Sequence, residues 1–246
     1  MTKIYGHRGS KGNYPENSML AFKKAIEAGV VGMELDIHLT KDNEIVVFHD
    51  PTLERTSTGA GYIKDLTLAE IQKFSIGAKF TEFAHYEKSW DDEKIPTLTE
   101  VLALLKAHDQ EVNIELKTYE FTYPGIEEKM LEIVKASGYD TNKVIYSSFH
   151  LPTLMRIQKA DPTAKVAFLT NFDLPIPQDY LDTLDWEGMH PGKDLVLKNP
   201  QAWGQMADKL RVWTVNDPAE MQTLIDLGVE AIITDYPEIA VPLVRK

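Results

Sequence analysis

The sequence predicts an α/β protein in which eight parallel strands alternate with helices and close into a barrel. Short β-rich runs alternate with longer helical patterns over most of the chain, which is typical of parallel βα units. The chain has 246 residues, close to the usual length of such a barrel. With 43% hydrophobic and 26% charged residues it has the composition of a globular protein with one core. We therefore expect a single domain, residues 1–246.

Nine runs have strand character, one more than the barrel needs. They are residues 4–8, 32–40, 44–50, 112–117, 144–149, 166–170, 188–190, 210–216 and 231–235. Only residues 41–43 separate the second run from the third, whereas a parallel crossover needs about a dozen residues. These two runs are therefore expected to form a hairpin. If the turn centres on Asp42 and Asn43, His49 lies opposite Asp36 and on the same face.

Residues 51–95 interrupt the regular alternation. They are rich in Thr, Gly and aromatic residues and contain one short helical piece, near 67–74. The barrel pattern resumes after them, where Thr97 and Glu100 have the spacing of a capping box. We expect an insertion subdomain at about 51–95 within the barrel domain.

Bulk composition narrows the functional classes. The net charge of -12 argues against a nucleic-acid partner, because Lys and Arg supply most of that affinity. The chain has no cysteine, so disulfides and thiolate metal sites are excluded. No apolar run is long enough for a membrane span, and the N-terminus lacks the pattern of a leader peptide. A cytoplasmic protein without stable membrane insertion is expected; its oligomeric state is not predicted.

Carboxylates line one face of two predicted strands. Alternation places Glu34 and Asp36 opposite the apolar face of the run 32–40, and Glu115 opposite that of the run 112–117. Such a pattern in one strand alone favours a solvent-exposed face. Inner barrel strands are usually apolar on both faces, however, so charge on two of them favours a function. Three hard oxygen ligands at one rim would suit one divalent cation, Mg²⁺ or Ca²⁺.

Five further residues are candidates for chemistry at the same rim. His7 and His49 can act as general acid and base near neutral pH. Arg8 and Lys117 supply fixed positive charge that suits a phosphoryl group. Trp213 can form a wall of the substrate pocket. For each the alternative stays open: a structural histidine, charge balance for a carboxylate, or an aromatic core residue.

Taken together, these residues resemble the glycerophosphodiester phosphodiesterase family. The similar segments run in family order over essentially the whole chain: "GHRG" at 6–9, "PENS" at 15–18, "ELDI" at 34–37, "FHDPTLERTSTGAG" at 48–61, "IPTLTEVL" at 95–102, "NIELK" at 113–117, "WTVN" at 213–216 and "GVEAIITDYP" at 228–237. The resemblance implies a TIM (β/α)₈ barrel with a small insertion after the second histidine. It also implies a metal held by Glu34, Asp36 and Glu115, His7 and His49 as acid and base, and phosphate contacts from Arg8 and Lys117.

The expected activity is metal-dependent hydrolysis of a small glycerophosphodiester to glycerol 3-phosphate and an alcohol. One alternative is a lysophospholipase D-like enzyme that acts on lipids. It would need an exposed apolar rim, for which Tyr62, Phe74, Phe80, Phe83 and Tyr86 of the insertion are candidates. An enolase-like barrel would need a capping domain for which the chain has no room. The other alternative is a catalytically silent barrel that binds a phosphorylated metabolite or a protein partner.

Overall fold

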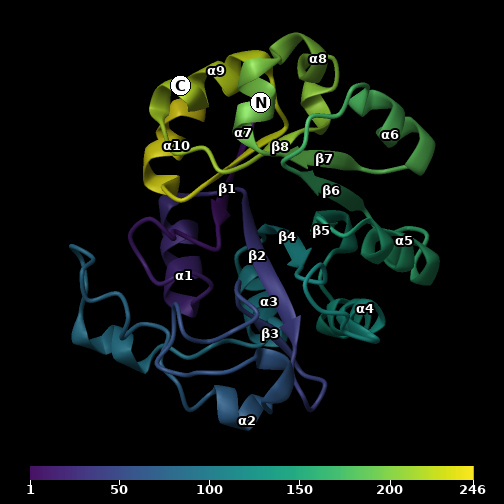
Figure 1. Ribbon diagram of the computed structural model, residues 1–246. Helices are drawn as coiled ribbons and strands as arrows, with labels where there is room; N and C mark the ends of the chain where they lie inside the picture. The colour runs from purple at the N-terminus through teal and green to yellow at the C-terminus, as the bar shows by residue number, and fades with distance from the viewer. Residues whose placement is uncertain (246) are drawn as a thin grey trace.

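The fold is a closed (β/α)₈ barrel, as the sequence predicts (Figure 1). The computed structural model describes residues 1–245, and in these residues eight parallel strands follow the order β7-β6-β5-β4-β2-β1-β9-β8. Bridges from Met189 to Leu210 and from Gly192 to Trp213 join β7 to β8 and close the circle. The strands are β1 (Lys3–His7), β2 (Gly32–Leu39), β4 (Glu111–Leu116), β5 (Val144–Ser148), β6 (Val166–Thr170), β7 (Gly188–Pro191), β8 (Arg211–Val212) and β9 (Ala231–Thr234).

Helices surround the strands and supply the outer layer of the barrel (Figure 1). They are α1 (Met19–Ala28), α2 (Leu68–Ile71), α3 (Leu98–Ala107), α4 (Ile126–Ser137), α5 (Leu151–Ala160), α6 (Pro177–Leu184), α7 (Lys193–Lys198), α8 (Pro200–Gly204), α9 (Pro218–Leu227) and α10 (Pro237–Val244). The capping box expected at Thr97 and Glu100 is present at the start of α3. Among the described helices, none combines the length and the apolar character that a membrane crossing requires.

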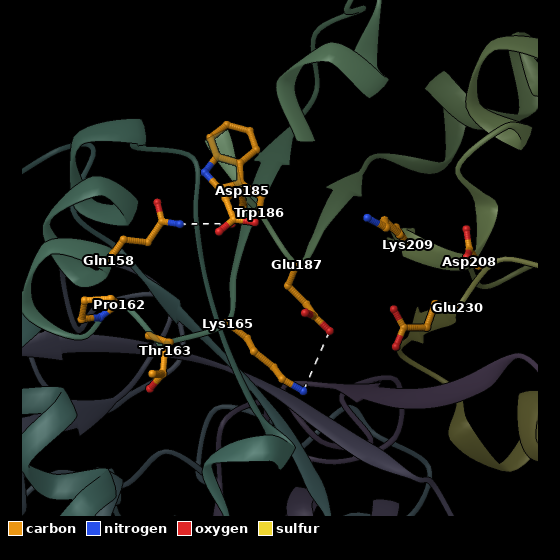
Figure 2. Close-up of a pocket in the computed structure, with 11 residues that line it drawn as sticks. Gln158, Pro162, Thr163, Lys165, Asp185, Trp186, Glu187, Asp208, Lys209 and Glu230 are labelled. Carbon is orange, nitrogen blue, oxygen red and sulfur yellow. Dashed lines mark hydrogen bonds and ion pairs between the residues drawn. The ribbon is translucent and has the colours of Figure 1, made fainter. Parts of the chain in front are cut away.

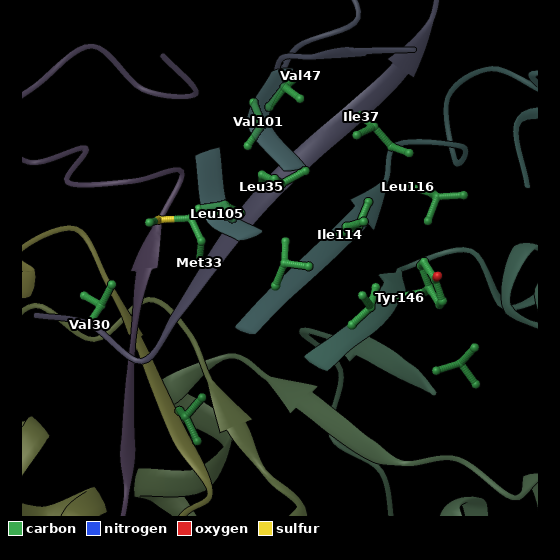
Figure 3. Packing of buried hydrophobic residues seen from close by; sticks show 14 of the residues in the cluster. Val30, Met33, Leu35, Ile37, Val47, Val101, Leu105, Ile114, Leu116 and Tyr146 are labelled. Carbon is green, nitrogen blue, oxygen red and sulfur yellow. The ribbon is translucent and has the colours of Figure 1, made fainter. Parts of the chain in front are cut away.

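The main core lies between the outward faces of the strands and the helices. Met33, Leu35 and Ile37 of β2 are fully buried and pack with Val101 and Leu105 of α3 (Figure 3). Because side chains alternate along a strand, the residues between them point into the barrel. The predicted division of β2 into an apolar face and an acidic face is therefore confirmed.

The ninth strand, β3 (Ile45–Val47), forms the predicted hairpin with β2, but the expected register is wrong by one residue. Ile37 pairs with Val47, so Phe48 rather than His49 lies opposite Asp36. The N–H of Phe48 donates to the Asp36 carbonyl at 3.0 Å. The cause is the turn, in which Asn43 has a positive φ of 61°. A turn that ends in such a residue takes up one more position than a two-residue turn.

The segment after the hairpin has a small hydrophobic cluster of its own. Seven buried residues form it: Val46, Phe48, Leu53, Ile63, Ile71, Ile76 and Ile95. Its helix α2 is shorter than expected and starts at a capping box on Thr67. This segment lies beside the mouth of the barrel, next to the hairpin that leads to His49.

Candidate active site

Three buried carboxylates converge at the carboxyl end of β2 and β4. Ligand atoms of Glu34, Asp36 and Glu115 all lie within 4.8 Å of one another. The register explains why, since Asp36 pairs with Glu115 across the two parallel strands and Glu34 shares the inward face of β2. The sequence-predicted set of acidic residues is therefore brought together by the barrel.

Two cations neutralise part of this negative charge. Lys117 Nζ lies 2.8 Å from Glu115 Oε1 and 3.5 Å from Asp36 Oδ1, and Arg8 Nε lies 3.2 Å from Asp36 Oδ2. Burial alone would raise the pKa of Asp36, but the charges of Arg8 and Lys117 outweigh burial and hold it well below its usual range. Asp36 is therefore charged at neutral pH.

The negative charges of the other two carboxyls, Glu34 and Glu115, are less fully balanced by nearby cations. Burial, reinforced by the charge of Asp36, raises the pKa of Glu34 well above its usual value. Burial also raises the pKa of Glu115, although Lys117 opposes it. In addition, no hydrogen bond from residues 1–245 reaches the buried Asp36 Oδ1, and its nearest cation in the ion pairs is Lys117 Nζ at 3.5 Å. A crowded, hard-oxygen triad with an unsatisfied ligand atom fits a divalent cation such as Mg²⁺ or Ca²⁺.

His7 ends β1 and is held by a carboxylate from the other end of the chain. Its Nδ1 lies 2.6 Å from Asp235 Oδ1, and Asn216 Nδ2 donates to the second oxygen of that carboxylate at 2.8 Å. Because a carboxylate accepts, Nδ1 carries the proton and Nε2 is left free, 3.9 Å from Glu34 Oε2. Burial and the nearby Arg8 lower the pKa of His7 to about 4, so its imidazole is neutral.

His49 is held by a carboxylate in a similar way. Its Nδ1 lies 2.6 Å from Asp50 Oδ1, and its Nε2 accepts a hydrogen bond from Lys117 Nζ at 3.1 Å. The carbonyl of His49 accepts from His38 Nε2 at 3.0 Å, which fixes the backbone where it leaves β3. Both histidines therefore keep one ring nitrogen bound to a carboxylate and turn the other toward the site.

The loop after β1 adopts a tight conformation that explains its glycine. Arg8 and Gly9 have positive φ values of 52° and 85°. A Cβ at Gly9 would lie 2.6 Å from the backbone carbon of Ala21, so no larger residue fits beside α1. This turn directs the Arg8 side chain back over the triad. Asn17 from the same loop donates to Asp36 Oδ2 at 2.9 Å.

A small pocket collects most of the predicted residues. It is lined by His7, Arg8, Glu34, His49, Asn113, Glu115, Lys117, Phe149, Leu169, Trp213 and Ile233. Trp213 forms part of the wall and meets Phe149 edge to face, with ring centroids 5.5 Å apart. Of the eight residues predicted from the sequence, seven line this pocket, and Asp36 lies buried directly beneath it.

A wider hollow lies at the other end of the barrel (Figure 2). Several of its lining residues directly precede strands: Lys165 before β6, Glu187 before β7 and Glu230 before β9. Lys165 and Glu187 form an ion pair there at 3.9 Å. Barrel enzymes keep their chemistry at the carboxyl ends of the strands, so this hollow is not the candidate active site.

Sequence reasoning missed the partners of the histidines. No role was expected for Asp50 or Asp235, although Asp50 directly follows His49 and Asp235 ends the run 231–235. Their position at strand ends is a signal that could have indicated them. Asn17 lies within the quoted segment "PENS", but its bond to Asp36 follows only from the loop conformation.

These groups define a class of protein. A barrel that presents two oriented imidazoles, an acidic triad suited to a hard cation, and two buried cations suited to phosphate has the parts of a phosphoester hydrolase.

Comparison with known proteins agrees with this class. The model of the "Glycerophosphoryl diester phosphodiesterase family" matches residues 7–239, and the chain belongs to that family. It is 39% identical to the glycerophosphodiester phosphodiesterase of Caldanaerobacter subterraneus subsp. tengcongensis, over 100% of this chain and 98% of that protein. A counterpart in Bacillus altitudinis is 38% identical, over 99% and 98% of the respective chains.

A solved structure is also similar, that of an Oleispira antarctica phosphodiesterase in complex with the product sn-glycerol-3-phosphate. It matches with a TM-score of 0.85 and 26% identity, over 100% of this chain and 98% of that one. The resemblance inferred from the sequence is therefore confirmed, and the protein is an enzyme of the phosphoric diester hydrolase class.

Proposed function

We propose that the protein hydrolyses a small glycerophosphodiester to glycerol 3-phosphate and an alcohol, with His7 and His49 as acid and base and a divalent cation at the acidic triad. The observation that carries this proposal is the pair of imidazoles, each with Nδ1 fixed by a carboxylate, beside one pocket that also contains Glu34 and Glu115. The product bound to the Oleispira antarctica relative supports the choice of substrate.

The residues of the pocket divide the chemistry among them. Arg8 and Lys117 bind the phosphate oxygens and oppose the charge that builds on them. The Nε2 of one neutral histidine takes a proton from the attacking oxygen, and the other histidine, in its doubly protonated form, gives its Nε2 proton to the departing alkoxide. The attacking oxygen is that of water, or that of the substrate's own hydroxyl, in which case water then opens the cyclic phosphate. A cation held by Glu34, Asp36 and Glu115 would supply a Lewis acid to the phosphoryl group.

The histidine roles are tested by replacing His7 or His49 with Ala and measuring turnover of glycerophosphocholine. Each proton transfer is typically worth roughly 10²- to 10⁴-fold, so kcat should fall by that factor in each variant. His85→Ala is the matched control, because that histidine is exposed in the insertion. A folded His7→Ala or His49→Ala protein with near-normal kcat would contradict the assignment.

The cation is tested separately from the histidines. Excess chelator should abolish turnover, and added Mg²⁺ or Ca²⁺ should restore it. A second measurement does not depend on activity: either ion should raise the melting temperature of the wild type more than that of Glu115→Gln, which loses one charged ligand. Full turnover in chelator would remove the cation from the proposal.

A second candidate substrate has an apolar group, as in a lysophospholipid. The aromatic residues expected to form a rim mostly pack within the insertion instead: Phe80 meets Phe83 at 5.2 Å, and Tyr86 meets the buried Trp90 at 5.7 Å. Only Tyr62 of the proposed set is exposed. Other residues favour the candidate. Three exposed side chains follow β4 and β6: Tyr119, Phe172 and Ile176. Of these, Tyr119 meets Phe149 of the pocket, with ring centroids 6.0 Å apart.

A homologous series of substrates separates the two candidates. Glycerol phosphodiesters of straight-chain alcohols would be compared with the choline diester. If the exposed residues contact the alkyl chain of the substrate, kcat/KM should rise by up to about fourfold per buried methylene, since each buried methylene contributes about 0.8 kcal/mol. Phe172→Ser should flatten that rise, whereas Val31→Ser, exposed before β2, should not. A flat series in the wild type rejects the apolar substrate.

The domain organisation, the location in the cell and the absence of a nucleic-acid partner are also part of the proposal. We propose that residues 1–246 form one domain with its insertion at about 51–95, in the cytoplasm and without a nucleic-acid partner. A catalytically silent barrel is the outcome if a panel of diesters binds without turnover.

A further inference from the structure

Arg55 lies in the insertion and joins two carboxylates at the edge of the active site. Its guanidinium donates to both oxygens of Glu16, with Nη1 at 3.0 Å and Nη2 at 2.7 Å. It also donates to both oxygens of Asp50, with Nε at 2.5 Å and Nη2 at 2.9 Å. A planar guanidinium can make two such forked contacts at once, whereas a lysine ammonium cannot.

Each of these carboxylates holds a residue of the proposed active site. Glu16 Oε1 accepts from Arg8 Nη1 at 2.9 Å, and Asp50 Oδ1 accepts from His49 Nδ1 at 2.6 Å. A chain of hydrogen bonds therefore runs from Arg8 through Glu16, Arg55 and Asp50 to His49. Arg55 is its central member and itself does not line the pocket.

The charges along this chain support one another. Burial would raise the pKa of Asp50, but hydrogen bonds from His49 and Arg55 outweigh it and keep the pKa well below its usual range. Hydrogen bonds to Glu16 and Asp50 raise the pKa of Arg55. Asp50 is thus an anion that is hydrogen-bonded to Arg55 on one side and to His49 on the other.

The backbone around Arg55 is held by the insertion itself. Leu53 belongs to the insertion cluster, and the N–H of the buried Ser57 donates to the Leu53 carbonyl at 3.0 Å. Thr58 N donates to the Ser75 carbonyl at 2.9 Å, and Ser75 N returns a bond to Thr58 Oγ1 at 2.9 Å. This segment presents Arg55 to the barrel from a rigid support.

We propose that Arg55 is a positioning residue, through which the insertion fixes Asp50 and hence the ring of His49 relative to the phosphate-binding Arg8. The inference rests on the proposed function of that site. The insertion then contributes to catalysis through one guanidinium and without touching the substrate.

The first test is kinetic. Arg55→Ala should lower kcat on glycerophosphocholine about 10- to 100-fold, the usual effect of losing an outer partner of a functional group, and change KM by less than about threefold. Arg156→Ala is the matched control: its side chain is 46% exposed against 47% for Arg55, and it pairs with the buried Glu127 at 2.7 Å on α4. Its kcat should stay within about twofold of the wild type.

The second test asks whether Arg55 acts through Asp50. In a double-mutant cycle, the double mutant Arg55→Ala/Asp50→Asn should have nearly the same kcat as Asp50→Asn alone, because Arg55 acts on His49 through Asp50. Guanidinium ions at concentrations that do not unfold the protein should restore part of the kcat of Arg55→Ala, whereas equal sodium chloride should not. Arg55→Gln provides a second variant if Arg55→Ala does not fold.

Two results would overturn the inference. One is a folded Arg55 variant whose kcat matches the wild type, and the other is a full multiplicative loss in the double mutant with Asp50→Asn. Both leave the proposed function intact, since wild-type turnover is measured in the same experiment. An inactive wild type would instead refute the proposed function.

Discussion

Lys117→Met would measure how much of the stability of the active site depends on one buried ammonium. The Lys117 side chain is 4% exposed, and its Nζ lies 2.8 Å from Glu115 and 3.5 Å from Asp36. Methionine has similar length and volume, so the substitution removes the charge without opening a large cavity. The carboxyls of the triad are then left with Arg8 as their nearby cation.

The magnitude follows from these distances. With an effective dielectric constant of about 20, the Coulomb attraction of Lys117 is about 6 kcal/mol to Glu115 at 2.8 Å and about 5 kcal/mol to Asp36 at 3.5 Å. Much of this attraction is offset by the cost of burying the ammonium. Removing one member of a buried ion pair typically costs about 3–5 kcal/mol. At about 2–4 °C per kcal/mol for a chain of this size, the melting temperature in chelator should fall by roughly 6–20 °C.

The assay is thermal unfolding in chelator and across a titration of Mg²⁺ or Ca²⁺. A divalent cation replaces the missing charge, so the variant should gain more stability from the ion than the wild type does. Lys193→Met is the control: Lys193 pairs with Glu220 at 2.7 Å on the surface, its side chain is 32% exposed, and its loss should cost about 1 kcal/mol or less. The control should respond to the ion like the wild type.

A loss of less than about 1 kcal/mol for Lys117→Met in chelator would refute this prediction, because removal of one member of a buried ion pair should leave an uncompensated charge on its partner. Equal stabilisation of wild type and variant by the cation would also refute it. In that case the ion would not share the carboxylates that Lys117 contacts.

Three further predictions concern other parts of the molecule. Asp235→Asn should lower kcat roughly 10- to 100-fold, because the charged acceptor that orients His7 is lost; steady-state kinetics measure this, and an unchanged kcat would contradict the role. Burial would raise the pKa of Asp235, but its hydrogen bond with His7 outweighs burial and lowers the pKa to about 2. The charged Asp235 should therefore contribute about 2 kcal/mol to the free energy of unfolding above about pH 4, and this contribution should be lost as the pH falls toward 2. Urea unfolding at several pH values should show this slope in the wild type, and a slope equally steep in Asp235→Asn would exclude the cause. Leu105→Ala in the core should cost about 2–5 kcal/mol in the same assay while kcat stays within about twofold, and a loss below 1 kcal/mol would contradict the packing.

Much of the fold could be predicted because its signals are local. Alternation in β2 assigns Leu35 to the core and Glu34 and Asp36 to the interior, whatever the rest of the chain does. The short link between β2 and β3 requires a hairpin for the same reason. Parallel strands share one carboxyl edge, so the carboxylates of β2 and β4 could be expected to meet there.

The register of the hairpin could not be predicted in the same way. It depends on the conformation of a single residue, Asn43, whose positive φ inserts one more position into the turn. His49 still reaches the site, because the chain leaves the ladder after Val47 and the carbonyl of His49 is held by His38. The expected location of His49 was therefore right, although the expected reason was wrong.

The sequence by itself determined which residue types stand at the strand ends, because a side chain's face depends on its immediate neighbours. Only the tertiary structure decided which carboxylate orients which imidazole. Asp235 reaches His7 from 228 residues away, and Arg55 joins Glu16 to Asp50 across separate loops. Such contacts require the barrel to be closed and the insertion to be folded, and neither condition is encoded in the spacing of the residues that meet.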